Sequence, residues 1–238
     1  MLVYAAFLNY NELDIIRFTI NHYKKIADKI FVFDNYSTDG SDLLAEEMGC
    51  EIIKFGRPGI LDDYAYLKVK NNPFAFIKHP KPNWLIVCDC DEILDISRDV
   101  LEAEMLNGST VLRTQGFNIY SNKMPVQEFS EIQTGFEDRN FSKNVCYNPT
   151  RIQSMNYGLG AHYCRPTGKR LYSHFYYPLL HYKCIGGAER VFKKHQDYLK
   201  RLPDHNNKSI AAHYRAEYDS FLIDFQNNID KANGNSKV

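Results

Sequence analysis

The first half of the chain alternates short apolar runs with segments whose apolar residues recur at helical spacing. The run at residues 3–8 is apolar throughout, as in a strand buried on both faces. The strands are expected at Val3–Leu8, Ile30–Phe33, Glu51–Phe55 and from Trp84, and the helices at Glu12–Lys25, Ser41–Met48 and Asp62–Asn71. This βαβα order predicts an α/β domain with a mostly parallel central sheet flanked by helices.

The second half has weaker periodicity. Thr110–Tyr120 predicts a further strand, which would be antiparallel, and residues 121–177 predict long loops with short strands. Helices are expected at Ala188–Arg201 and Ala211–Asn228, before a polar tail at residues 231–238 that is expected to be disordered. We therefore expect a single domain over residues 1–230, in which the regular alternation of strands and helices ends near residue 120.

Composition narrows the choice of partner and compartment. The 238 residues suit one large domain, and Lys+Arg and Asp+Glu balance at 29 each, so no basic field would attract nucleic acid. The six cysteines form no CxxC pair, a pattern that favours reduced thiols and a cytoplasmic protein. No apolar run approaches the ~20 residues that span a bilayer, so any membrane contact would be peripheral, at the inner face.

The strand from Trp84 ends in a cluster of carboxylates, in the sequence WLIVCDCDE. In an extended segment Asp89 and Asp91 project to one side, while Cys88 and Cys90 project to the other as an apolar wall. An Asp-X-Asp pair suits Mg²⁺ or Mn²⁺, which takes one or two protein carboxylates when it also holds phosphate oxygens. The alternative is an acidic turn that faces water.

Two more strands end in polar sequence. Asn9-Tyr10-Asn11-Glu12 follows the first strand, and the second is followed by DNYSTDGS, residues 34–41, which alone is compatible with a capped turn. With DCDE, in this order and spacing, they resemble the family 2 glycosyltransferases. That resemblance covers residues 1–120 and implies one Rossmann-like domain of the GT-A fold, with a nucleotide-sugar half (1–120) and an acceptor half (121–230).

The resemblance also implies roles for individual residues. It places a divalent cation, Mn²⁺ or Mg²⁺, on Asp91, with Asp89 beside it and with His181 from a late His181-Tyr182-Lys183 element typical of a bacterial branch. The residues expected to bind the nucleotide sugar are Asn9, Glu12, Asp34, Asn35, Asp63, Asn71, Asp89 and Lys183. Asn35 and Tyr36 depart from the family's usual acid and glycine, and uracil remains the expected base.

The implied activity is a metal-dependent glycosyltransferase of the hexosyltransferase type, acting on a UDP-sugar. Its acceptor would be a glycan or glycolipid hydroxyl, in the synthesis of a bacterial surface polysaccharide or lipopolysaccharide. A carboxylate must accept the hydroxyl proton if the reaction inverts configuration. Glu137 and Asp138, in the sequence GFEDR, resemble the family's acidic pair after the metal motif, and Glu128 and Glu131 are alternatives.

Two other functions compete with this interpretation. A nucleotidyltransferase would ordinarily carry a glycine-rich, lysine-bearing loop after the first strand, where this chain has Asn9-Tyr10-Asn11-Glu12. A non-catalytic nucleotide-sugar-binding protein of the same fold would keep the acidic cluster and lack a base. A zinc site fails on spacing, because close Cys/His pairs do not recur.

Overall fold

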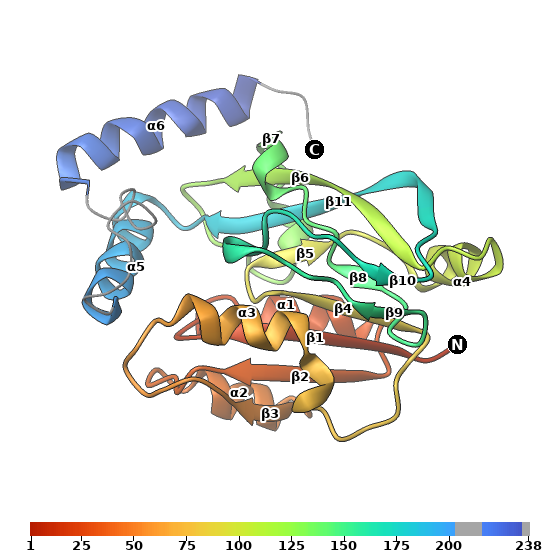
Figure 1. Cartoon of the computed structure of the whole chain (residues 1–238). Helices are drawn as coiled ribbons and strands as arrows, with labels where there is room; N and C mark the ends of the chain where they lie inside the picture. The colour runs from red at the N-terminus through yellow and green to blue at the C-terminus, as the bar shows by residue number, and fades with distance from the viewer. Residues whose placement is uncertain (203–215, 235–238) are drawn as a thin grey trace.

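The computed structural model describes residues 1–202 and 216–234, which form helices around a central, mostly parallel sheet (Figure 1). The predicted α/β class is therefore confirmed. Within the described residues the sheet has nine strands in the order β3-β2-β1-β4-β8-β6-β11-β5, with β7 paired beside β6. Strands β3, β2, β1 and β4 run parallel, as do β6 and β11, whereas β8, β5 and β7 run antiparallel to their neighbours.

The element boundaries are as follows. The strands of the large sheet are β1 Val3–Asn9, β2 Lys29–Asp34, β3 Glu51–Lys54, β4 Trp84–Asp89, β5 Glu92–Leu94, β6 Val111–Tyr120, β7 Gly135–Glu137, β8 Cys146–Tyr147 and β11 Tyr172–Cys184. A separate hairpin joins β9 Ile152–Ser154 and β10 Thr167–Gly168. The helices are α1 Ile16–Lys24, α2 Ser41–Glu47, α3 Asp63–Asn71, α4 Arg98–Leu106, α5 Ala188–Arg201 and α6 Tyr218–Gly234. The part of the chain that the structure describes also has four short 3-10 helices, η1 Pro73–Ala75, η2 Phe129–Glu131, η3 Arg139–Phe141 and η4 Leu159–Ala161.

The apolar run of β1 explains the layering. Val3, Ala5 and Phe7 pack in one core with α1 and α2, whereas the alternate residues pack in a second core with α3 on the opposite face. Because side chains alternate across a strand, a strand covered on both faces must be apolar at every position. All seven residues of β1 are buried.

Several boundaries differ from the sequence-based expectation. The first helix begins at Ile16 and not at Glu12, because residues 12–15 form a turn in which the Glu12 carbonyl accepts from the Ile15 and Ile16 amides. Residues 231–234 of the expected disordered tail belong to α6, and residues 235–238 lie outside the described residues. The helix expected from Ala211 is observed from Tyr218, while residues 211–215 lie outside the described residues.

Helix α4 and strand β11 are the longest elements that were not predicted. Helix α4 follows Ser97, whose hydroxyl caps it by accepting from the backbone of Val100. Strand β11 begins within the segment expected to be loop, and it pairs parallel with β6 and antiparallel with β5. The strand expected at Thr110–Tyr120, β6, accordingly has a parallel neighbour as well as antiparallel ones.

Helices α5 and α6 extend from the sheet beyond the end of β11 (Figure 1). They are held together by a small apolar cluster of Val191, Phe225 and Ile229. No helix among residues 1–202 and 216–234 has the length and apolar character needed to cross a bilayer.

Candidate functional site

A pocket of about 340 Å³ opens where β1 and β4 end. Its walls come from the loop after β1, one face of α3, the β4–β5 turn, strand β11, the η3 and η4 segments, and the end of α5. The carboxyl ends of parallel strands deliver polar side chains to this edge of a sheet. Six of the expected site residues line it, and they are Glu12, Asp63, Asp89, Asp91, His181 and Lys183.

Asp91 and His181 face each other in this pocket. The Tyr182 amide donates to the Asp91 carbonyl, which joins the β4–β5 turn to β11 beside His181. The Asp91 Oδ1 and His181 Nε2 atoms are 3.7 Å apart, which exceeds hydrogen-bond distance. Burial alone would raise the pKa of Asp91, but its neighbours His181 and Lys194 lower it below its usual value. Burial lowers the pKa of His181 and favours its neutral form.

The other oxygen of Asp91 faces helix α5. Lys194 Nζ lies 3.8 Å from Asp91 Oδ2 and also contacts the carboxylate of Glu12. Burial raises the pKa of Glu12 to about 7, against the attraction of Lys194. The second carboxylate oxygen of Glu12, Oε2, is buried without a hydrogen-bond partner among the described residues. The α5 lysine thus supplies a positive charge to two carboxylates from the first half of the chain.

Asp89 faces two lysines. Its carboxylate bonds to Lys70 Nζ at 2.8 Å and lies 3.7 Å from Lys143 Nζ. Lys143 also pairs with Glu92, which is 1% exposed and accepts from the Asp89 amide. These charges, more than the opposing effect of burial, lower the pKa of Glu92 to about 2 and raise that of Lys143. The carboxylates of the acidic turn therefore form an ion cluster with two lysine ammonium groups, and both lysines line the pocket.

Two side chains of the pocket are placed to bind a divalent cation. No group of three or more His, Cys, Asp or Glu side chains placed to hold a metal ion is found in residues 1–202 and 216–234. Asp91 Oδ1 and His181 Nε2 nevertheless fit one, because two ligands of a common cation lie about 3–4 Å apart when each bond is about 2.1 Å. A carboxylate and a neutral imidazole suit Mn²⁺ or Mg²⁺ when substrate phosphates complete the coordination.

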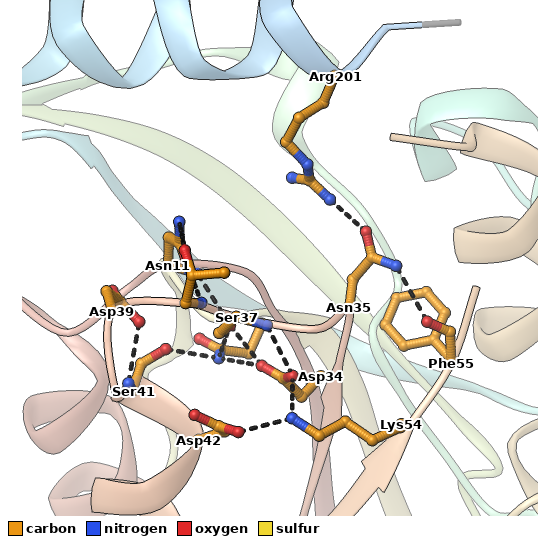
Figure 2. Close-up of polar contacts among 12 residues, drawn as sticks. Asn11, Asp34, Asn35, Ser37, Asp39, Ser41, Asp42, Lys54, Phe55 and Arg201 are labelled. Atoms are coloured by element: carbon orange, nitrogen blue, oxygen red, sulfur yellow. Dashed lines mark hydrogen bonds and ion pairs between the residues drawn. The ribbon is translucent and has the colours of Figure 1, made fainter. Parts of the chain in front are cut away.

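Asn9 and Asp34 hold a turn. Figure 2 shows Asp34 accepting from Ser37 and Lys54, and the Asn9 amide bonds to Asp34 at 2.8 Å as well as to Ser37 and Ser41. Burial would raise the pKa of Asp34, but the bonds from Lys54 and Ser37 lower it. Neither Asn9 nor Asp34 is among the residues that line the pocket. Their role in this structure is to shape the loop after β2.

Asn35 meets the C-terminal end of α5. Its amide donates to the Phe55 carbonyl at 3.0 Å and its oxygen accepts from Arg201 (Figure 2). The Arg201 guanidinium also stacks on the Tyr10 ring, 3.1 Å from the centroid. Arg201 is 6% exposed, and its Nε and Nη1 have no hydrogen-bond partner among the described residues. A buried guanidinium with unused donors, stacked on the pocket-lining Tyr10, can donate hydrogen bonds to oxygen atoms of a ligand.

Helix α3 presents one face to the pocket. Asp62 caps it by accepting from the Tyr64 amide. Asp63 and Lys70 are two helical turns apart, so they share a face, and both line the pocket. Burial, with the charge of Asp62, raises the pKa of Asp63. Asn71 lies one residue further around the helix and bonds in both directions to the backbone of Tyr157. It therefore holds the segment before η4 and does not line the pocket.

Glu137 and Asp138, expected as the base, lie on β7 and at its end, outside the pocket lining. Glu137 is exposed and 3.9 Å from Arg139. Asp138 accepts from Asn118 Nδ2 at 2.9 Å and from the Asn140 amide.

Sequence reasoning missed the contribution of α5. Lys194, Tyr198 and Arg201 contact or line the site from one helical face. Their spacing of four and three residues within a predicted helix was the available signal, since such positions share a face. Lys183 also reaches this face of α5, because its Nζ lies 5.6 Å from the centroid of the Tyr198 ring.

No protein-family model matches the chain, and no curated protein matches it. Among solved structures, residues 1–349 of Staphylococcus aureus TarS are similar over 96% of this chain and 71% of that one, with 12% identity and a TM-score of 0.43. A Mycobacterium tuberculosis glucosyl-3-phosphoglycerate synthase bound to Mn²⁺, UDP and glucosyl-3-phosphoglycerate is similar over 49% of this chain, with 18% identity and a TM-score of 0.34. The match spans 44% of that enzyme's length. These similarities assign no role to a residue of this chain.

Proposed function

We propose that this protein is a metal-dependent glycosyltransferase of the GT-A fold that uses a nucleotide-diphosphate sugar. The single observation that carries the proposal is the facing pair of Asp91 and His181 in a pocket that also holds lysines. Carboxylate and imidazole suit a divalent cation, and lysine ammonium groups suit phosphate oxygens. Their position at the carboxyl edge of a parallel sheet is where α/β folds bind nucleotides.

The proposed roles follow the placement of the side chains. Asp91 and His181 would hold Mn²⁺ or Mg²⁺, which supplies charge stabilisation to a departing diphosphate. Lys183, and Lys70 beside Asp89, would neutralise further phosphate charge from the pocket wall. Asn35, with Arg201, would meet the base and ribose.

The substrates follow from the resemblance to family 2 enzymes. The donor would be a UDP-sugar and the reaction transfer of a hexosyl group to a glycan or glycolipid hydroxyl, with a bacterial surface polysaccharide or lipopolysaccharide as the product class. Glu137 and Asp138 remain the predicted proton acceptors, and their use would require the acceptor to reach outside the present pocket lining.

A screen of nucleotide sugars for metal-dependent hydrolysis tests the proposal without an acceptor. We expect release of UDP from a UDP-sugar in Mn²⁺ and little release after chelation, because the diphosphate is a poor leaving group without charge neutralisation. Calorimetry with UDP and Mn²⁺ should show binding that depends on the cation. Cation-dependent binding with neither hydrolysis nor transfer would favour the non-catalytic alternative, and no binding of any nucleotide would contradict the proposal.

Arg201→Met separates nucleotide binding from stability. Replacing a buried ion by an apolar side chain of similar length is often neutral or stabilising, so we expect an unchanged or higher melting temperature. UDP affinity should fall about 10–100-fold, because a charged hydrogen bond contributes about 1.5–3 kcal/mol. Lys200→Met, on the exposed side of the same helix turn, is the matched control. Unchanged UDP affinity in Arg201→Met would remove Arg201 from the nucleotide site.

A further inference from the structure

His181 is held by one side chain from strand β6 and one from the η3 segment. The parallel register of β11 and β6 places His181 beside Asn118, and its Nδ1 lies 3.0 Å from Asn118 Oδ1. The other end of the same amide, Nδ2, donates to Asp138 Oδ2 at 2.9 Å. Phe141 stacks on the imidazole with ring centroids 4.4 Å apart and planes inclined by 28°. The hydrogen bond to Asn118 and the stacking on Phe141 thus fix the rotation and the plane of the His181 ring, and Asp138 holds Asn118 in place.

The direction of these bonds determines which ring nitrogen carries the proton. A carboxylate only accepts hydrogen bonds, so Asp138 takes the NH₂ end of Asn118 and turns the carbonyl oxygen toward His181. That oxygen also only accepts, so the hydrogen bond requires a proton on Nδ1. In the neutral ring Nε2 then carries a lone pair, which faces Asp91 Oδ1 at 3.7 Å.

A lone pair that faces a carboxylate oxygen is unfavourable unless a cation or a hydrogen-bond donor lies between them. The separation is too long for a hydrogen bond and suits two ligands of one divalent ion, which lie about 3–4 Å apart. We propose that Asn118 and Asp138 are positioning residues that hold His181 in its Nδ1–H tautomer, so that Nε2 and Asp91 offer a prearranged pair of ligands to a divalent cation. This inference rests on the proposed function for the identity of that cation.

The inference gives Asp138 a role different from that of the proton acceptor. A base acts on the acceptor hydroxyl, and its loss would lower turnover without changing cation affinity. A positioning residue two hydrogen bonds away from the cation changes its affinity, typically by 10–100-fold. The two roles therefore differ in a measurement that needs neither donor nor acceptor.

The tautomer is measured directly on the metal-free protein. With ¹⁵N-labelled histidine, we expect His181 to show a protonated Nδ1 and an unprotonated Nε2, and the His181→Gln variant identifies its signals. Asn118→Leu should allow both tautomers, because it removes the acceptor that selects one. A wild-type His181 protonated at Nε2 would overturn the inference whatever the activity of the enzyme.

Affinity for Mn²⁺ alone is the second measurement. We expect Asn118→Leu and Asp138→Leu each to weaken Mn²⁺ binding about 10–100-fold, while Gln115→Leu on the same strand leaves it unchanged. The exchanged pair Asn118→Asp with Asp138→Asn should restore binding to within about threefold, because the new carboxylate accepts from Nδ1 and the new amide donates to it.

The outcomes distinguish the two proposals. Wild-type Mn²⁺ affinity in Asp138→Leu with an unaltered tautomer would overturn the positioning role and leave the glycosyltransferase proposal standing. An Nδ1–H tautomer in a protein that binds no Mn²⁺ would overturn the cation site and the metal-dependent function with it. Because the exchanged pair retains both polar side chains, its failure to restore binding in a folded protein would also count against the inference.

Discussion

Replacing Asp91 with asparagine is expected to reduce metal-dependent donor cleavage by at least about 10²–10³-fold, the cost of losing one strong electrostatic contact in a transition state. Asp91 is the carboxylate that faces both His181 and Lys194, and the asparagine amide lacks its negative charge. The backbone carbonyl that accepts from Tyr182 is unchanged, so the β4–β5 turn should persist. UDP release at saturating Mn²⁺, with Mn²⁺ affinity measured in parallel, tests this expectation.

The exposed Asp95→Asn, four residues further along, is a control of the same chemistry. It should retain both cation affinity and donor cleavage. A wild-type rate in Asp91→Asn at saturating Mn²⁺ would show that Asp91 is not the principal ligand. Equal melting temperatures for the two variants would exclude misfolding as the reason for a loss.

The second large effect is expected on stability. Lys143→Met leaves Glu92, 1% exposed, without its closest cation, and breaking a buried pair in this way costs about 3–5 kcal/mol of unfolding free energy. Urea unfolding at neutral pH measures the loss. Adding Glu92→Gln should recover most of it, because a neutral amide can be buried at lower cost and can still accept from the Asp89 amide.

The same pair predicts a dependence on acid. Although burial opposes it, the attraction of Lys143 and Lys70 lowers the pKa of Glu92 to about 2, below its usual 4.5. The stabilisation by Glu92 is therefore full above pH 4.5 and is lost as the pH falls toward 2. The Lys143→Met, Glu92→Gln double variant should lose less stability over that interval. Lys29→Met, in the exposed pair with Glu51, should cost no more than about 1 kcal/mol at any pH.

Local pattern predicted the first half of the fold well. The continuous apolar run of β1 and the polar residues that end β1, β2 and β4 are local signals, and they identified the parallel sheet and the edge where the pocket lies. The irregular second half was harder, because β11 is recognised through its pairing with β6 and β5 and not through alternation of its own residues. Pairing of distant segments leaves little trace in a single sequence.

In the candidate site, too, local sequence signals identified some residues, and others depend on how distant segments pack. Asp89 and Asp91 could be identified because they end a buried strand, and both line the pocket. The cations that meet this acidic turn come from α3, from Lys143 before β8 and from α5, so their arrival depends on how those segments dock. Asp138 had the expected residue type after the metal motif, yet its neighbour across the sheet, Asn118, decides what it contacts. Residue type alone cannot supply that information.

The docking of α5 has a consequence for partial unfolding of this chain. One rigid helix contacts Glu12 after β1, Asp91 after β4 and Asn35 after β2, through side chains on a single face. Detaching the helix would break all three contacts together. Partial unfolding that frees α5 is therefore expected to remove the wall of the pocket that this helix supplies.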